Sequence, residues 1–228
     1  MIHQFIFAGP KPGLSAEAFQ SYWVNFHAVD YAAKIPQIRQ YLVATRLSAS
    51  GAREVPFFQG AAEIWLQNDE EQLASLQTPE FLQGARLDEP RWAAFWRTFV
   101  HDADTEIVKS AVFRAEGYNK LYVFLKRRPD LSLAQFHSRL LEQHRQTALA
   151  VPGTLGYLAS FARPGAYGLG EPRFDAIEVY SFVSAADATA ALTSVAAMEE
   201  SWKAFCNTDY LFTFIGQEHW VIRPGQRD

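Results

Sequence analysis

The first half of the chain alternates between short apolar runs and longer stretches in which apolar residues have helical spacing. Runs rich in branched and aromatic residues predict strands, whereas apolar residues three or four positions apart predict a helix with one buried face. Strands are predicted at residues 5–7, 41–47, 61–66 and 106–113, with helical segments after the first and third. The predicted order is therefore strand, helix, strand, strand, helix, strand.

The first helix has the clearest sequence signals. Ser15 is a favourable N-cap residue, because its hydroxyl can accept a hydrogen bond from the first turn. Phe19, Trp23, Phe26 and His27 follow at helical spacing, so we expect them on one buried face.

The second helical region begins near Asp69 and again at Thr78, where Pro79 suits the first helical position. A loop is expected at residues 48–51. The aromatic residues expected to share one face near the end of this region are Trp92, Phe95 and Trp96.

The second half repeats this order. Its strands are predicted from residue 121 onward and at residues 155–161, 176–182 and 217–222, with a glycine- and proline-rich loop at 163–173. Ser132 caps the matching helix, whose apolar stripe contains Phe136, Leu140 and His144.

Matching residues recur in both halves in the same order. Leu14, Phe19 and His27 match Leu131, Phe136 and His144 at one constant offset, and Pro36 and Tyr41 match Pro152 and Tyr157 after one residue is dropped. Further on, Glu63 and Trp65 match Glu178 and Tyr180 with one more residue dropped, and Trp92 and Phe95 match Trp202 and Phe205. Such an ordered series indicates two copies of one unit, at residues 1–114 and 118–228.

Units of this element order form ferredoxin-like folds with helices on one face of an antiparallel sheet. The other sheet face needs a cover, and each copy alone would have a marginal core. We therefore expect an α+β fold in which two β-α-β-β-α-β repeats pack sheet to sheet as an intrachain dimeric barrel. Two copies of the whole chain could still associate as a homodimer.

Composition narrows the possible partners. A hydrophobic content of 49% and an aromatic content of 14% indicate a packed globular protein. The net charge of −4 provides no basic surface, which argues against nucleic acid. The single Cys206 excludes an intrachain disulfide and a cysteine-based zinc site. Because we find neither a signal-peptide pattern nor a long apolar run, we expect a cytoplasmic protein with no membrane partner.

Tyr22-Trp23, His27, Pro36 and Tyr41 together resemble the motif of the EthD family of dimeric α+β barrel proteins. The second half has a weaker form of it, with Leu140, His144, Pro152 and Tyr157, so the chain resembles a tandem two-copy form. The resemblance implies a pocket between sheet and helices in each copy. It also implies cofactor-independent isomerisation, dehydration, decarboxylation or oxygenation of aromatic, polyketide-like or lactone substrates.

The two pockets should differ, because Arg139-Leu140 stands where the first copy has Tyr22-Trp23. We expect the larger cavity in the first half. Tyr22, Trp23 and Tyr41 are the candidates for shaping that cavity, and His144 and Tyr157 are their counterparts in the second half.

His27 is the candidate catalytic residue. Burial beside an aromatic residue favours a neutral imidazole, which can accept and donate protons near pH 7. The alternative is a core histidine that only satisfies a structural hydrogen bond. That structural role is the one we favour for His144, which has polar neighbours.

Other polar strand residues are open to two interpretations. Tyr41 and Tyr157 could orient a substrate carbonyl or hydroxyl, or could be ordinary amphipathic strand residues. Glu63 and Glu178 could be bases beside an apolar pocket, or could be paired or solvent-facing residues.

Neither a metal nor a cofactor is expected. His137 and His144 are seven residues apart, about 10 Å along a helix, which is too far to share one ion. We find no dinucleotide or phosphate motif. The leading hypothesis is thus a cofactor-independent enzyme for a small apolar or aromatic substrate. The alternatives are a non-catalytic ligand-binding protein and a haem-binding α+β barrel with His27 as axial ligand.

Overall fold

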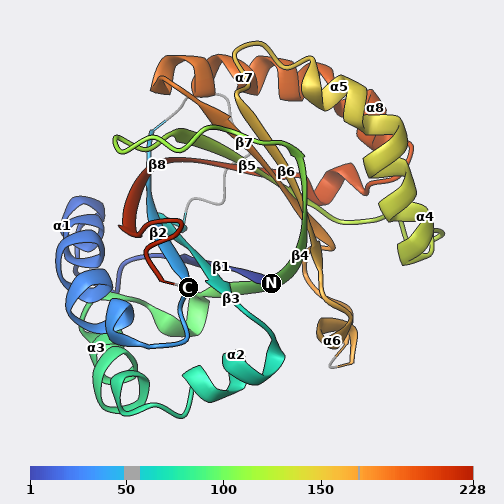
Figure 1. Cartoon of the computed structure of the whole chain (residues 1–228). Coiled ribbons are helices and arrows are strands. Elements are labelled where there is room, and N and C mark those ends of the chain that lie inside the picture. Colours follow the sequence, from blue (N-terminus) through green and yellow to red (C-terminus); the bar gives the residue numbers. More distant parts are fainter. Residues whose placement is uncertain (49–56, 169, 228) are drawn as a thin grey trace.

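The computed structural model of the protein describes residues 1–48, 57–168 and 170–227. In that part of the chain, eight antiparallel strands close into one barrel, in the order β1-β3-β2-β8-β5-β7-β6-β4. The strands are β1 (Ile2–Ala8), β2 (Gln40–Arg46), β3 (Gly60–Leu66), β4 (Phe99–Lys109), β5 (Asn119–Leu125), β6 (Gly156–Ala162), β7 (Ala176–Phe182) and β8 (Phe212–Ile222). Figure 1 shows the barrel between two layers of helices.

Each half of the chain contributes four strands, and the halves meet along two seams. β2 of the first half pairs with β8 of the second, and β4 pairs with β6. The expected α+β barrel is confirmed. The two sheets also share hydrogen-bonded edges, beyond the face-to-face packing that we expected, and this closure removes the exposed strand edges. The finer hypothesis, two ferredoxin-like repeats at residues 1–114 and 118–228, stays a prediction.

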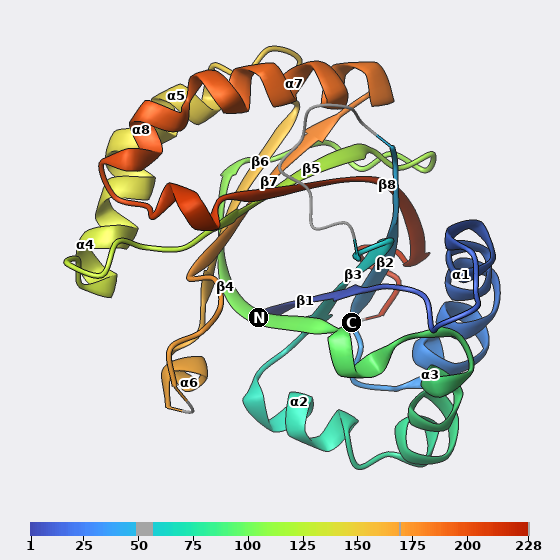
Figure 2. The same cartoon turned by 180° about the vertical axis from the view of Figure 1, so that it is seen from behind.

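Most helices of each half cover the outer face of its own strands, whereas α6 (Pro164–Tyr167) lies apart from the helical layer of the second half (Figures 1 and 2). In the first half the helices are α1 (Ala16–Tyr22), η1 (Trp23–Tyr31), η2 (Ala32–Lys34), α2 (Asp69–Ser75), η3 (Glu80–Ala85), α3 (Arg86–Trp92) and η4 (Phe95–Arg97). In the second half they are α4 (Leu133–Ser138), η5 (Arg139–His144), α5 (Arg145–Leu149), α6 (Pro164–Tyr167), α7 (Ala185–Ala197), α8 (Glu199–Lys203) and η6 (Thr208–Tyr210). None of the described helices is long and apolar enough to cross a membrane.

Strand alternation divides the buried residues into three clusters. Two clusters lie between a helical layer and the outer strand faces, and one fills the barrel interior. In β1, for example, Phe5 and Phe7 belong to the interior cluster, whereas Ile2 and Ala8 pack under the first-half helices. Successive side chains of a strand point to opposite faces, which explains this division.

The predicted helix starts are confirmed. The Ser15 hydroxyl accepts from Ala18 N, and Ser132 forms a reciprocal capping box with Gln135. The predicted face of the first helix is wrong at Phe26, whose side chain is exposed. The reason is that residues 23–31 form a π-helix, in which the spacing of an α-helix no longer holds.

The predicted aromatic face at residues 92–96 is also wrong. Trp92 is buried at the end of α3, but Phe95 and Trp96 are exposed in the separate segment η4. Ala93 is extended and interrupts the helical spacing between these residues. β4 begins at Phe99 and ends at Lys109, so the strand predicted at residues 106–113 is wrong at both ends, and β8 begins at Phe212, before residue 217. Both strands continue along a seam partner from the other half.

Strand register corrects one part of the repeat alignment. Tyr41 pairs with Ile64 in the first half, and Tyr157 pairs with Tyr180 in the second. The counterpart of Tyr180 is therefore Ile64, so matching Glu63 with Glu178 is wrong by one residue. A shift of one residue reverses the face of a strand residue, and these two glutamates do lie on opposite faces of the barrel wall.

Glu63 belongs to a charged network inside the barrel. Its carboxylate accepts from Lys120 Nζ at 2.7 Å, from Tyr122 Oη at 2.6 Å and from His3 at 2.9 Å. Lys120 Nζ also lies 3.0 Å from Glu218 Oε1. Because Lys120 comes from the second half, this network links the two halves across the interior.

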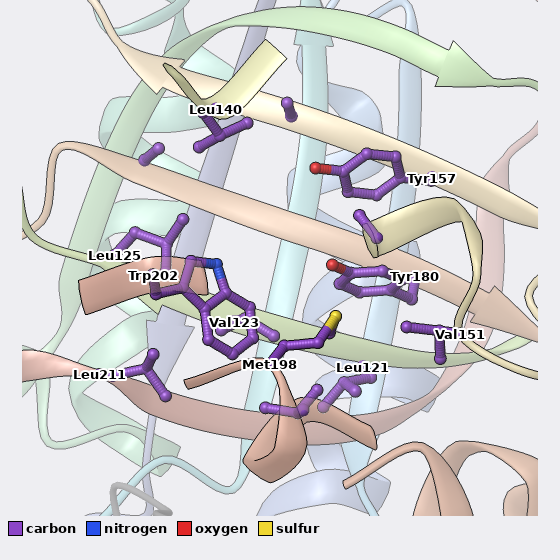
Figure 3. Close-up of a cluster of buried hydrophobic side chains, with 14 of the residues drawn as sticks. Leu121, Val123, Leu125, Leu140, Val151, Tyr157, Tyr180, Met198, Trp202 and Leu211 are labelled. Atoms are coloured by element: carbon purple, nitrogen blue, oxygen red, sulfur yellow. The ribbon is translucent and has the colours of Figure 1, made fainter. Parts of the chain in front are cut away.

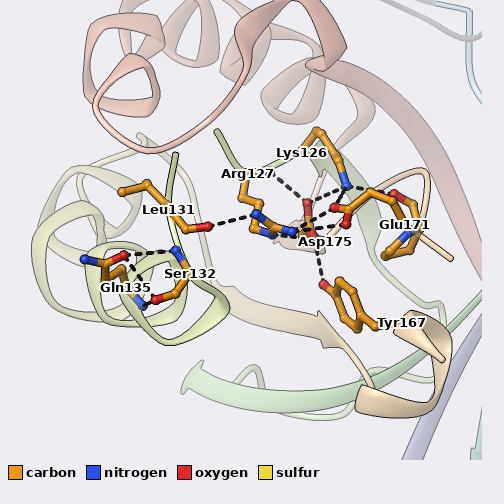
Figure 4. Close-up of polar contacts among 9 residues, drawn as sticks. Lys126, Arg127, Leu131, Ser132, Gln135, Tyr167, Glu171 and Asp175 are labelled. Carbon is orange, nitrogen blue, oxygen red and sulfur yellow. Dashed lines mark hydrogen bonds and ion pairs between the residues drawn. The ribbon is translucent and has the colours of Figure 1, made fainter. Parts of the chain in front are cut away.

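The loop predicted at residues 163–173 contains α6 and is anchored by a polar cluster (Figure 4). The buried carboxylate of Asp175 accepts from Tyr167 Oη at 2.6 Å and lies 3.0 Å from Lys126 Nζ. Arg127 binds Glu171 in the same cluster. The loop predicted at 48–51 lies outside the described residues except for Ser48.

Candidate functional site

A cavity of about 300 Å³ lies in the first half, between the helices and the outer faces of β1, β2 and β3. The residues that line it and are used below are Ala62, Trp23, His27, Tyr41, Glu89, Trp92 and Thr98. Most of the remaining wall is aliphatic. The cavity lies in the half where the sequence predicted the larger pocket.

The small side chain of Ala62 leaves the strand face open beneath the helices. Trp23 and His27 reach the cavity from the π-helix η1, and Trp92 reaches it from α3. The ring of Trp92 lies 4.7 Å from that of His27 and 4.9 Å from that of Trp23, between centroids. π-Helical turns are frequent at functional sites, because they shift side chains away from ordinary helical positions.

His27 forms a dyad with Asp88, a buried residue of α3. Nδ1 of His27 lies 2.9 Å from Asp88 Oδ2, and Tyr22 Oη donates to Asp88 Oδ1 at 2.8 Å. Arg91 Nη1 lies 3.5 Å from the same Oδ1. A carboxylate only accepts hydrogen bonds, so this contact places the ring proton on Nδ1 and leaves a lone pair on Nε2.

Burial lowers the pKa of His27, and the hydrogen bond and charge of Asp88 oppose that shift. The imidazole is therefore neutral near pH 7. Among the described residues, none is hydrogen-bonded to Nε2. A neutral histidine with a fixed tautomer and one free nitrogen beside a cavity can act as a general base.

Glu89 is the second ionisable group on the cavity wall. Burial raises its pKa to about 7, the charge of Asp88 adds to this, and Arg86 opposes it. Arg86 Nη1 lies 3.6 Å from Glu89 Oε2, beyond hydrogen-bond distance. Glu89 Oε2 is buried and has no hydrogen-bond partner in the described part of the chain.

Tyr41 is held by Trp23, whose Nε1 donates to the phenol oxygen at 3.2 Å. Burial raises the pKa of Tyr41, so its phenol stays protonated and can donate to a ligand.

The equivalent region of the second half is filled by side chains (Figure 3). Glu178 reaches it from β7, accepts from Tyr157 Oη at 2.5 Å and lies 3.4 Å from His144 Nε2. His144 Nδ1 lies 2.9 Å from Ser201 Oγ. By strand register, Glu178 occupies the position that Ala62 has in the first half.

The structure brings three of the predicted site residues together: Trp23, His27 and Tyr41 line the first cavity. Tyr22 is not among its lining residues and instead supports Asp88 from behind. His144 and Tyr157 lie in the filled region of the second half. Among described residues, no group of three metal-ligating side chains occurs.

Sequence analysis missed Asp88 and Glu89. Asp88 and Trp92 are four residues apart, so they share a helix face. That spacing predicts that the carboxylate of Asp88 is buried on the same helix face as the tryptophan. It does not reveal the partner, because His27 is distant in the sequence and meets Asp88 only in the folded chain.

The fold is that of a dimeric α+β barrel, and its candidate site is a cavity beneath the helices of the first half. Residues 11–95 match the family model described as the EthD domain. This match confirms the resemblance that the motif of the first half suggested, and it does not extend to the second half. A comparison with curated proteins gives no match.

Solved structures with similar folds cover nearly the whole chain. An anthrone oxidase-like protein is 10% identical, with 98% of this chain and 94% of that chain covered and a TM-score of 0.64. A protein from Lactobacillus acidophilus described as a monooxygenase is 10% identical, with coverages of 95% and 93% and a TM-score of 0.54. A mutant chlorite dismutase from Candidatus Nitrospira defluvii is 9% identical, with coverages of 95% and 91% and a TM-score of 0.53. At such identities the similarity concerns the fold alone.

Proposed function

We propose that this protein is a small-molecule enzyme that performs acid–base chemistry without a cofactor in its first-half cavity. The observation that carries the proposal is the His27–Asp88 dyad on the wall of an otherwise largely apolar cavity. Its substrate is a small apolar or aromatic molecule, in keeping with the lining residues. EthD membership of the first half and the oxidase- and monooxygenase-like neighbours support small-molecule chemistry.

In the proposed mechanism, Nε2 of His27 removes a proton from an acidic carbon or hydroxyl of the bound substrate. Asp88 holds the ring in the required tautomer and stabilises the imidazolium that forms. The phenol of Tyr41, which stays protonated, donates to the oxygen on which negative charge develops. Returning the proton to another atom completes an isomerisation, and departure of a neighbouring leaving group with its electron pair instead gives an elimination.

A haem group fits this cavity poorly. A histidine with a carboxylate on its second nitrogen could serve as an axial ligand. However, about 300 Å³ is at the low end of the ~300–1,000 Å³ typical of ligand pockets, and no lysine or arginine is among its lining residues to bind the propionates. The carboxylate of Glu89, which lines the cavity, would also repel those propionates.

The proposal is tested by proton exchange at carbon. The protein is incubated with beta-tetralone in deuterium oxide, and NMR follows deuterium entering the acidic carbon position. We expect His27→Gln to reduce the protein-catalysed rate by about two orders of magnitude, the usual contribution of general acid–base assistance. Its melting temperature should stay within a few degrees of wild type, because glutamine can still bond to Asp88.

His144→Gln is the matched control, because it changes the corresponding histidine of the second half. It should lower stability by leaving buried partners unsatisfied, yet keep the exchange rate of the folded protein. Full exchange in folded His27→Gln would refute the catalytic role. Binding of the ketone without catalysed exchange in wild type would favour the non-catalytic binding protein.

A further inference from the structure

Three polar atoms of cavity-lining residues have no hydrogen-bond partner within the described residues. They are Glu89 Oε2, Trp92 Nε1 and Thr98 Oγ1, and all three are buried. Leaving a buried polar group without a hydrogen-bond partner destabilises the folded protein. All three atoms belong to residues that line the same cavity, where a bound molecule would supply the missing partners.

The three atoms offer different hydrogen-bonding roles. An ionised Glu89 only accepts, the indole of Trp92 only donates, and the hydroxyl of Thr98 does either. A ligand that satisfies them needs both a donor, such as a hydroxyl, and an acceptor, such as a carbonyl oxygen. A pure hydrocarbon would leave all three unsatisfied.

The charges around the cavity disfavour the binding of anionic ligands. Asp88 and Glu89 are adjacent carboxylates, and the lining residues include no lysine or arginine. Arg86, which lies 3.6 Å from Glu89, is the cation beside that carboxylate and is not part of the wall. A carboxylate or phosphate on the ligand would lose its hydration without gaining a positive partner.

Building on the proposed function, we infer that the cavity selects a neutral one- or two-ring compound that carries both a hydroxyl and a carbonyl group. The hydroxyl donates to Glu89, and the carbonyl accepts from Trp92 or Thr98. The volume of about 300 Å³, the space of roughly ten water molecules, suits this size.

Three compounds of similar size separate these features. They are meta-hydroxyacetophenone, meta-methoxyacetophenone, which lacks the donor, and meta-hydroxybenzoate, which is anionic. Binding to the full chain is measured by calorimetry at pH 8, where Glu89 is mostly ionised. We expect the hydroxyketone to bind at least ~10-fold more tightly than its methyl ether, the equivalent of one lost buried partner. The benzoate should show no saturable binding.

Variants at Glu89 give the decisive comparison. Glu89→Leu should remove the preference for the hydroxyketone over the methyl ether, whereas Glu89→Gln, which still has an acceptor oxygen, should keep part of it. Equal affinity for both ketones in wild type, or tight binding of the benzoate, would overturn the inference.

The outcomes also separate this inference from the proposed function. The expected binding order without catalysed proton exchange would support the ligand class and refute catalysis. Catalysed proton exchange without a preference for the hydroxyketone would support catalysis and refute the inferred ligand class. If none of the three compounds binds, the inferred ligand class is overturned.

Discussion

Burial shifts the pKa values of His27 and Glu89 in opposite directions, because it disfavours the charged form of each. The pKa of His27 falls below its usual value, and that of Glu89 rises to about 7. A neutral imidazole and a partly protonated carboxyl therefore share one cavity at physiological pH. These are the protonation states that general acid–base chemistry requires.

The raised pKa of Glu89 has a consequence for stability. Between pH 4.5 and about 7 the folded protein holds a proton that the unfolded chain has released, so stability falls as pH rises through this window. We expect Glu89→Gln to raise stability by about 2 kcal/mol at pH 8 and by little at pH 4.5. Urea unfolding at both pH values measures this difference. A stability gain that is equal at the two pH values would show that ionisation of Glu89 is not its source.

Part of the candidate site could be predicted from the sequence, residue by residue. Helical spacing grouped Trp23 with His27, and the motif that resembles the EthD family added Tyr41 to them. Asp88 and Glu89 come from α3, and their roles depend on how that helix packs against η1. Such packing depends on contacts between distant parts of the chain, which single-sequence periodicity does not encode.

At the level of elements, β3 and β7 differ in the side chain that they place beneath their helical layers. The two strands occupy equivalent places, but Ala62 faces the helices in β3 where Glu178 does in β7. The sequence match of Glu63 with Glu178 concealed this, because one residue of register separates the two faces. The strands themselves were predictable from composition, and their relative register needed the hydrogen-bonded pairs.

This arrangement predicts the effect of filling the cavity from the strand side. Ala62→Leu should place its side chain in open space, so the protein should keep its fold while its affinity for meta-hydroxyacetophenone falls at least ~10-fold. Calorimetry and thermal unfolding measure the two effects.

Ala61→Leu is the matched control, because Ala61 precedes Ala62 and faces the packed barrel interior. Overpacking there should cost about 1–3 kcal/mol of stability and leave the affinity of the folded protein unchanged. If Ala62→Leu binds the hydroxyketone as wild type does, the cavity is not the binding site.

At the level of the whole molecule, the pairing of strands across the two seams could not be predicted from the sequence. β4 and β8 each pair with one strand of their own half near their starts and with one strand of the other half near their ends. Apolar alternation in a single half identifies a buried strand but not a partner from the other half. The α+β barrel could therefore be predicted, whereas the hydrogen-bonded closure of its edges could not.

The charged network inside the barrel depends on this closure. Burial opposes ionisation of Glu63, but the charge of Lys120 and the hydrogen bonds from His3 and Lys120 outweigh it and lower the pKa of Glu63 to about 2. A carboxylate with a depressed pKa stabilises the folded state above pH 4.5, and that contribution is lost as pH falls toward 2. Lys120 is thus the partner that makes two buried glutamates tolerable.

Lys120→Met should consequently destabilise the protein by about 3–5 kcal/mol at pH 7, because Glu63 and Glu218 lose their shared cation. Without Lys120, burial dominates and the pKa of Glu63 rises, so the loss relative to wild type should shrink as pH is lowered toward 4.5. Lys203→Met, which removes a partly exposed ion pair with Glu200, should cost at most about 1 kcal/mol at either pH. Urea unfolding of both variants at pH 7 and pH 4.5 distinguishes a buried network that joins the halves from an ordinary ion pair. Equal, small losses for the two lysines would mean that the interior charges do not hold the barrel together.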